Sequence, residues 1–340
     1  MPVFNPVKVS EEFLQALPKR VRDVVERRFG IGKTKERKTL EAIGSSYGIT
    51  RERVRQIEAH GLKKLRSHEF LRERGEVFNS LKEELLKRGG IMEEEELLTS
   101  LSKSPEEKNH LRFLLTLAAD FKRHKEDEEF QGRWSADDKL AEACHQTLRV
   151  MHRELGGQEP LEERELKARL AVAAEGVLGA RPGEETVNSW LSVSKMIASN
   201  KLGGWGLVDS PSISPRGVRD LAYLVMKRHG SPLHFSEVTQ QIKKNLGEPA
   251  HLQTVHNELI KDARFVLVGR GLYALKEWGY EPGTVKDIIR NILTSSGPLT
   301  REKLIEKVLK ERHVKTATIQ INIQDKRYFK ILEDGRVALV

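Results

Sequence analysis

The chain has 340 residues, of which 38% are hydrophobic, 32% are charged and 6% are aromatic. This length allows several small domains, and no stretch approaches the roughly 18 consecutive apolar residues that a membrane-spanning helix needs. The single cysteine, Cys144, excludes an internal disulfide framework and fits a reducing cytosol. The N-terminal segment has no apolar core of signal-peptide length, so we expect a cytoplasmic protein with no membrane contact.

Positive charge is concentrated in the first quarter of the chain. The formal net charge is +9, and residues 1–75 hold 18 Lys or Arg against 10 Asp or Glu. The remaining residues hold 41 basic and 40 acidic side chains, so they are nearly neutral. This distribution favours a polyanionic partner for residues 1–75. The alternative is a solvated basic surface without a partner.

The first predicted helix covers residues 10–28, with a break or cap at Pro18. The following segment, RFGIGKTKERK, is predicted to be a loop because glycines and charges replace the apolar periodicity. Its Gly32-Lys33-Thr34 resembles the end of a phosphate-binding loop, but that motif needs a glycine where Arg27 stands and a preceding buried strand. We therefore do not expect a nucleotide site here.

A helix-turn-helix is predicted next, in TLEAIGSSYGITRERVRQIEAHGLKKLR. Leu40 and Ile43 indicate a short amphipathic helix, Gly48 a tight turn, and Thr50 the N-cap of a longer helix. Four residues at helical spacing are expected to face inward on the second helix: Val54, Ile57, Leu62 and Leu65.

The opposite face of the second helix carries side chains that can read base pairs. Arginine can bond O6 and N7 of guanine, glutamine N6 and N7 of adenine, and glutamate N4 of cytosine. The candidate base-reading residues are Arg51, Glu52, Arg55 and Gln56. The candidate phosphate contacts are Arg28, Lys38, Thr39, Arg53, Lys63, Lys64 and Arg66. Periodicity alone leaves a plain three-helix packing unit as the alternative.

Particular residues of this segment narrow the choice. The motifs are Leu17-Pro18-x-Arg20, Arg28-Phe29-Gly30, Thr39-Leu40-Glu41-x-Ile43-Gly44, GITRERVRQIE and LKKLR. Together, over residues 13–66, they resemble region 4 of the primary sigma factors of bacterial RNA polymerase. The resemblance implies that Arg51, Glu52, Arg55 and Gln56 contact the promoter −35 element. It also implies RNA polymerase as a partner, through the flap of its β subunit.

The segment departs from the family pattern at His60 and Gly61, where a basic residue and an alanine are usual. A glycine inside a helix costs about 1 kcal/mol relative to alanine, so we expect the helix to fray after Glu58. Nothing else in the sequence resembles the strand-melting and clamp-binding regions of a working sigma factor. We therefore expect that the chain is not a complete sigma factor.

Residues 76–340 contain a repeated pattern of a helix, a glycine-marked turn, two more helices and a hairpin. The marker glycines are Gly90, Gly157, Gly230 and Gly297, which are 67, 73 and 67 residues apart. Three helices followed by a hairpin are typical of a winged helix. The fold expected is therefore mainly α with small β-hairpins: a helix-turn-helix domain (1–75) and four winged-helix modules. We call these module 1 (76–136), module 2 (137–213), module 3 (214–280) and module 4 (281–340).

Module 3 resembles the HARE-type winged helix, as in the RNA polymerase delta subunit, through LHFSEVTQQI, TVHNELIKDARFVLVGRGLYAL and Trp278. Its candidate DNA contacts are Gln253, His256, Asn257, Arg264 and Arg270, but a protein-docking or spacer role is slightly favoured. Module 4 is more basic, in KVLKERHVKTATIQINIQDKRYFK, and its choice between DNA and protein stays open.

No catalytic, cofactor or metal site is predicted. The histidine spacing fits no zinc motif, and the glutamates of residues 93–96 are interpreted as a solvated helix start. We expect a bacterial, nucleoid-associated transcription protein that binds double-stranded DNA, is not an enzyme and has an unknown oligomeric state. The alternatives are an RNA polymerase accessory subunit that acts by protein contacts, and an adaptor in DNA restriction or repair.

Overall fold

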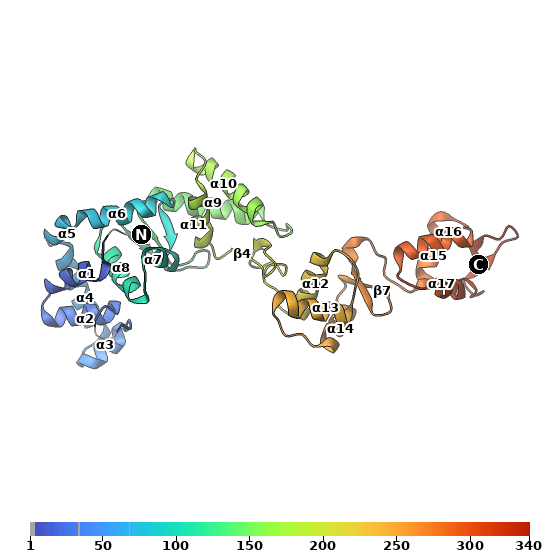
Figure 1. Ribbon diagram of the computed structural model, residues 1–340, viewed down its shortest axis with the longest axis horizontal. Coiled ribbons are helices and arrows are strands. Elements are labelled where there is room, and N and C mark those ends of the chain that lie inside the picture. Colours follow the sequence, from blue (N-terminus) through green and yellow to red (C-terminus); the bar gives the residue numbers. More distant parts are fainter. Residues whose placement is uncertain (1–3, 33–34, 68) are drawn as a thin grey trace. The chain divides into compact units, whose positions relative to one another are not determined.

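The structure is a computed structural model that describes residues 4–32, 35–67 and 69–340. Lys33 and Thr34, which belong to the predicted loop and to the rejected nucleotide motif, lie outside this range. The chain divides into two compact units, unit 1 (Met1–Ala198) and unit 2 (Ser199–Val340). Both are mainly helical with small antiparallel sheets, as Figure 1 shows. No helix in the described ranges is long and apolar enough to cross a bilayer.

Five helices begin unit 1. They are α1 (Pro6–Gln15), α2 (Lys19–Phe29), α3 (Leu40–Tyr47), α4 (Arg51–Arg66) and α5 (Glu69–Glu73). Pro18 separates α1 from α2, as the sequence predicts. Gly48 ends α3 in the left-handed conformation with φ 64°, and the Thr50 hydroxyl accepts a hydrogen bond of 3.2 Å from the Arg53 amide. The predicted helix-turn-helix is therefore present, with the turn and cap residues in their expected places.

The predicted fraying of α4 is wrong, because the helix continues without a break to Arg66. Gly61 is buried where α4 crosses α2. A Cβ atom at Gly61 would lie 2.8 Å from Cγ1 of Val21 and 3.4 Å from Cγ2 of Val25. The two helices approach so closely because this residue has no side chain, and their packing offsets its poor helix propensity.

After α5, three helices followed by two strands recur four times, and modules 1 and 3 have an additional strand after their first helix. Module 1 has α6 (Gly75–Lys87), β1 (Ile91–Glu93), α7 (Glu94–Leu101), α8 (Pro105–Leu117), β2 (Lys122–His124) and β3 (Arg133–Ser135). Module 2 has α9 (Asp138–Glu154), α10 (Glu163–Leu178), α11 (Glu184–Val193), β4 (Ile197–Ser199) and β5 (Trp205–Leu207).

Modules 3 and 4 lie in unit 2. Module 3 has α12 (Val218–His229), β6 (Leu233–His234), α13 (Phe235–Gln241), the π-helical turn η1 (Ile242–Leu246), α14 (Leu252–Lys261), β7 (Phe265–Gly269), β8 (Leu272–Leu275) and the 3₁₀ turn η2 (Lys276–Trp278). Module 4 has α15 (Val285–Ser296), α16 (Arg301–Glu311), α17 (Thr316–Ile323), β9 (Phe329–Ile331) and β10 (Val337–Leu339).

The four marker glycines lie at or shortly after the end of the first helix of each module. Gly90, Gly157, Gly230 and Gly297 follow the first helix of each segment, and all have φ between 71° and 76°. This left-handed conformation favours glycine, which explains why the sequence repeats it. Modules 1 and 3 also share one sheet topology. Each has a three-stranded antiparallel sheet, with strand orders β1-β3-β2 and β6-β8-β7.

One hydrophobic core joins the first five helices to module 1. Phe13 contacts Phe78 with ring centroids 6.2 Å apart, and Phe29 contacts Phe113 at 5.3 Å. All four rings belong to a single buried cluster. The boundary predicted near residue 75 therefore falls inside a shared core, and the predicted domain limits stay a prediction. In unit 2, by contrast, modules 3 and 4 each bury a cluster of their own.

Candidate nucleic-acid interface

The N-terminal half of α4 presents a polar face to solvent. Arg51, Glu52, Arg55 and Gln56 are all exposed, whereas Val54 on the other side of the helix is completely buried. Val54 packs in a small cluster with Val24 of α2 and Ile43 of α3, which holds α4 across the preceding helices. The structure thus brings the four candidate base-reading residues together on one open surface.

Two contacts within α4 organise these side chains. Arg55 donates from Nε and Nη2 to the two carboxylate oxygens of Glu52, at 2.8 and 2.7 Å, and Arg53 donates to Oε1 of Gln56 at 3.0 Å. The hydrogen bond from Arg55 lowers the pKa of Glu52, and the same bond raises that of Arg55. The pair remains 59% and 57% exposed, and exposed pairs contribute little stability. Both groups can therefore exchange this contact for a base edge at small cost.

The candidate phosphate contacts fall into two groups. Arg53, Lys63, Lys64 and Thr39 are exposed, and Lys38 is partly exposed. Thr39 also caps α3 by accepting a hydrogen bond from the Ala42 amide at 3.1 Å.

Arg28 and Arg66 are engaged in contacts within the fold. Arg28 donates to the Lys38 carbonyl at 3.3 Å and lies 3.5 Å from the Glu58 carboxylate, and Arg66 donates to the Thr116 carbonyl at 2.8 Å. Burial raises the pKa of Glu58 even though Arg28 opposes this shift. A phosphate would have to replace these contacts, so the open residues are the better candidates.

A hollow beside α4 is lined by two residues that the sequence analysis did not identify as DNA contacts. Arg20 and His60 line it together with Arg53, Gln56 and Ile57. Arg20 lies 5.4 Å from the centre of the Tyr47 ring. Arg20 belongs to the motif Leu17-Pro18-x-Arg20. Its position in the same hollow as Gln56 depends on how α2 packs against α4, which the sequence does not show.

The other side of the first four helices is covered by module 1. Helix α8 packs against α1, α2 and α4, and the Asn109 side chain donates to the carbonyls of Gly30 and Lys35 at 3.1 and 3.2 Å. Lys35 also pairs with Glu106 at 2.6 Å. The apolar face of the helix-turn-helix is thus used inside unit 1, and its charged face remains open.

The interpretation of residues 93–96 as a solvated helix start is wrong for Glu94, which is 7% exposed. Its carboxylate forms ion pairs with the guanidinium groups of Arg112 and Arg123, both at 2.6 Å. Burial opposes ionisation of Glu94, but hydrogen bonds from these two guanidinium groups keep its pKa below the ordinary value. Glu94 therefore links α7 to α8 and β2 through these two ion pairs.

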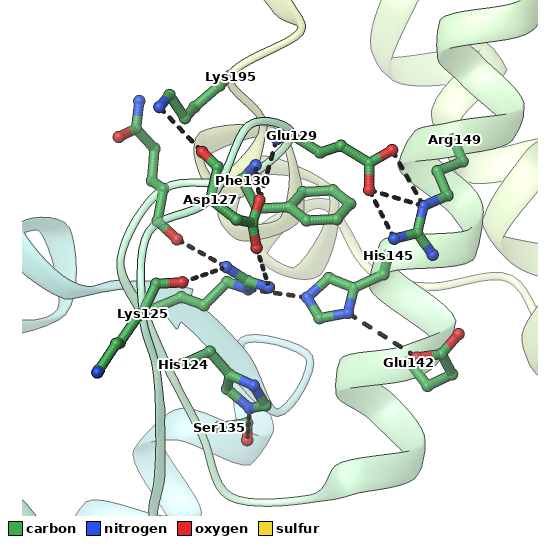
Figure 2. A network of polar contacts seen from close by, with 12 residues as sticks. His124, Lys125, Asp127, Glu129, Phe130, Ser135, Glu142, His145, Arg149 and Lys195 are labelled. Carbon is green, nitrogen blue, oxygen red and sulfur yellow. Dashed lines mark hydrogen bonds and ion pairs between the residues drawn. The ribbon is translucent and has the colours of Figure 1, made fainter.

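The loop between β2 and β3 is held against module 2, a contact that local sequence does not reveal. The amides of Gln131 and Lys195 donate to the carbonyls of Val193 and Glu129, both at 2.9 Å. Phe130 is 1% exposed and stacks on the His145 ring, with centroids 4.5 Å apart. Figure 2 shows Phe130 and His145 side by side, with Glu129 reaching Arg149. The β2–β3 loop thus connects module 1 to module 2 and is closed to an external partner at these residues.

Comparison with known proteins covers the N-terminal part. A family model described as "Sigma-70, region 4" matches residues 13–67. Over 60 residues, 18% of this chain, the chain is 45% identical to RNA polymerase sigma factor RpoD of Helicobacter pylori. It is 48% identical over 56 residues to RNA polymerase sigma factor SigA of a Bacillus species and 50% identical over 56 residues to SigA of a Nostoc species, in each case 16% of this chain. These matches cover only 9%, 15% and 14% of the relatives' lengths. Residues 13–67 therefore form a sigma-70 region 4 domain.

Proposed function

We propose that this protein binds duplex DNA through α4 and associates with RNA polymerase in transcription. The observation that carries this proposal is the open N-terminal end of α4 within a region 4 domain. In a helix-turn-helix this end of the second helix enters the major groove. Arg51, Arg55 and Gln56 supply donors suited to guanine and adenine, and Glu52 supplies an acceptor for cytosine. The preferred sequence is then similar to a −35 element.

The phosphate backbone would be held from both sides of the reading helix. Arg53, Lys63 and Lys64 are exposed along α4, and Thr39 lies at the N-terminus of α3. Cationic contacts of this kind fix position and provide most of the affinity, and base contacts provide the choice of sequence. We infer that residues 76–340 form four further modules, and a complete sigma factor is therefore not proposed. We infer that these are winged helices, which the sheet orders of modules 1 and 3 support.

Replacing Arg55 with alanine is expected to weaken binding to the preferred sequence by about 1–3 kcal/mol and to relax selectivity at one base pair. The reason is that a bidentate contact to guanine is lost, whereas the phosphate contacts remain. Binding of the full chain to a set of duplexes, each changed at one base pair, measures both effects. Lys64→Ala is the matched control, since the loss of a phosphate contact should weaken all duplexes alike. If Arg55→Ala behaves in the same uniform way, Arg55 does not read a base.

The second candidate is a polymerase accessory subunit that acts through protein contacts. The charged face of α4 is open, and module 1 covers the apolar face of the region 4 domain, so the structure favours the DNA-binding function. One assay distinguishes the two candidate functions. Salt-dependent binding of the full chain to duplex DNA without polymerase supports DNA reading, whereas co-purification with polymerase in the absence of such binding supports the accessory role. Docking on the β flap remains part of the proposal and is tested by the same co-purification with a flap-deleted polymerase.

A further inference from the structure

The four modules contain equivalent helices, each placed immediately before the closing hairpin: α8, α11, α14 and α17. Two of them are occupied by neighbours inside unit 1. Helix α8 packs against the region 4 domain. Helix α11 packs on β1, where the Trp190 indole donates to the Gly89 carbonyl at 3.1 Å. Neither can present a free face to a large partner along these contacts.

In module 3, α14 combines a paired arginine with an apolar exposed surface. Arg264, which follows the helix, is held by Asp262 at 2.7 Å and Asp220 at 2.8 Å. His256 stacks on Phe235 with ring centroids 4.3 Å apart. The exposed surface includes the apolar side chains of Leu252 and Ile260. These features do not suit a polyanion.

In module 4, α17 has a different character. Ile319 and Ile323 are 0% and 4% exposed and fix the helix to a core that includes Phe329. The outward side carries short polar or aliphatic side chains with no carboxylate: Thr316, Ala317, Thr318, Gln320 and Ile321. Glutamine and threonine can bond base edges, and an aliphatic side chain can contact the thymine methyl group.

Cations flank both ends of α17. Lys315 is its N-cap residue, and Lys326, Arg327 and Lys330 follow its C-terminus, all exposed. In the described part of the chain, no hydrogen bond or ion pair engages the side chains of Lys315, Lys326 or Lys330. The one acidic residue between positions 312 and 330, Asp325, is neutralised by Arg327 at 2.9 Å and Lys286 at 3.2 Å.

The junction before α17 keeps this face in place. The buried Arg312 donates to the carbonyls of Glu281 and Gly283, and the His313 amide donates to the Val268 carbonyl at 2.8 Å. Arg312 is therefore used in the fold, and the exposed lysines are the free cations. A helix with its side chains is about 10–12 Å in diameter, which fits the major groove of about 12 Å width.

We propose that α17 is a second duplex-DNA contact, in which the helix enters a major groove and Lys315, Lys326 and Lys330 hold the phosphates on either side. This contact is independent of DNA reading by α4. The chain then has two DNA-binding elements, α4 and α17, and modules 1 to 3 connect them.

The test uses the full chain and a duplex of random sequence, with affinity measured over a range of salt concentrations. The triple variant Lys315→Gln, Lys326→Gln, Lys330→Gln should bind at least about tenfold more weakly, and its salt dependence should fall by about 2.7 in slope, near 0.9 for each phosphate contact. The control is Lys243→Gln, Lys244→Gln, Lys276→Gln, which removes the same charge from exposed positions of module 3. It should leave the slope unchanged. Equal effects of the two triples would overturn the proposal.

Two further variants separate the possible causes. The triple Lys→Arg variant at 315, 326 and 330 keeps the charges and should retain binding, and a loss there would point to a structural role and overturn the phosphate assignment. Combining Arg51→Ala and Arg55→Ala should abolish sequence preference but leave salt-dependent binding, which the module 4 triple should weaken further. If the module 4 triple matches its control while the α4 variant loses its sequence preference, the α17 contact fails and the proposed function stands. If the module 4 triple weakens binding while the α4 variant keeps its full sequence preference, the proposed function of α4 fails and the α17 contact stands.

Discussion

Replacing Arg133 with alanine is expected to destabilise unit 1 by about 1–3 kcal/mol. Arg133 lies on β3 and is 5% exposed. Its guanidinium donates to His145 Nε2 at 2.8 Å, to the carbonyls of Lys125 and Gln131 at 3.2 and 3.0 Å, and to Asp127 at 3.2 Å. Removing it leaves these acceptors without a donor, and it also leaves a cavity beside the Phe130 ring, whose centre lies 4.9 Å from the guanidinium carbon.

Arg149→Ala is the matched control in the same network. Arg149 makes a bidentate contact with Glu129, at 2.6 and 3.0 Å (Figure 2). The two side chains are 47% and 40% exposed. Loss of an exposed pair costs at most about 1 kcal/mol. Urea unfolding of the full chain, followed by tryptophan fluorescence, compares the two variants. Similar shifts in the unfolding midpoint would show that the β2–β3 loop of module 1 is not held by the buried guanidinium.

Unit 1 is also expected to lose about 3 kcal/mol of stability between pH 6.5 and pH 4 through His145. Burial lowers the pKa of His145 from 6.5 to about 4, with Arg133 and His124 adding repulsion. Glu142, at 4.0 Å, opposes the shift weakly, and Arg149 adds slightly to it. Because the Arg133 Nε–H donates to His145 Nε2, that nitrogen must carry a lone pair, and protonation there would break the bond.

The sign of the pH effect follows from which state takes up the proton first. The unfolded chain protonates His145 below about pH 6.5, whereas the folded chain does so only near pH 4. Stability from this group is therefore complete above pH 6.5 and falls as the solution is acidified. Unfolding free energies of the full chain and of His145→Gln should be measured at both ends of the window. The glutamine oxygen still accepts from Arg133 and does not titrate, so the variant should lose about 3 kcal/mol less than the parent. An equal loss in both proteins would contradict a buried neutral imidazole.

The sequence was sufficient for local features of this fold. Apolar periodicity located α3 and α4, and the special properties of Gly48 and Thr50 located the turn and the cap. The repeated glycines located the ends of four helices to within a few residues, because the turn that follows each helix contains a residue with positive φ. Each of these features depends on residues within a few positions of each other, so the local sequence is enough to predict it.

Long-range packing could not be predicted in this way. The helix-turn-helix shares its core with α8, and Trp190 bonds a carbonyl 101 residues earlier. Gly61 illustrates the difference: its propensity favoured fraying, but the close approach of Val21 makes glycine the fitting residue. Arg28 and Arg66 look like phosphate contacts in sequence, and only the packed structure shows the carbonyls that they bond.

This packing also bears on function. The apolar face of the region 4 domain is covered by module 1, and the β2–β3 loop of module 1 is fixed to module 2. What remains open on the domain is a polar helix end with Arg51, Arg55 and Gln56. An interface of charged and amide side chains on a rigid support suits a DNA groove, because reading a base edge requires side chains held in a defined position.

The most direct measurement of this central claim is the selection of bound duplexes from a random DNA pool by the full chain. The proposed function predicts recovery of one short motif similar to a −35 element, and its loss when Arg51, Arg55 and Gln56 are replaced with alanine together. Recovery of no motif, or of the same motif by the triple variant, would contradict sequence reading by α4.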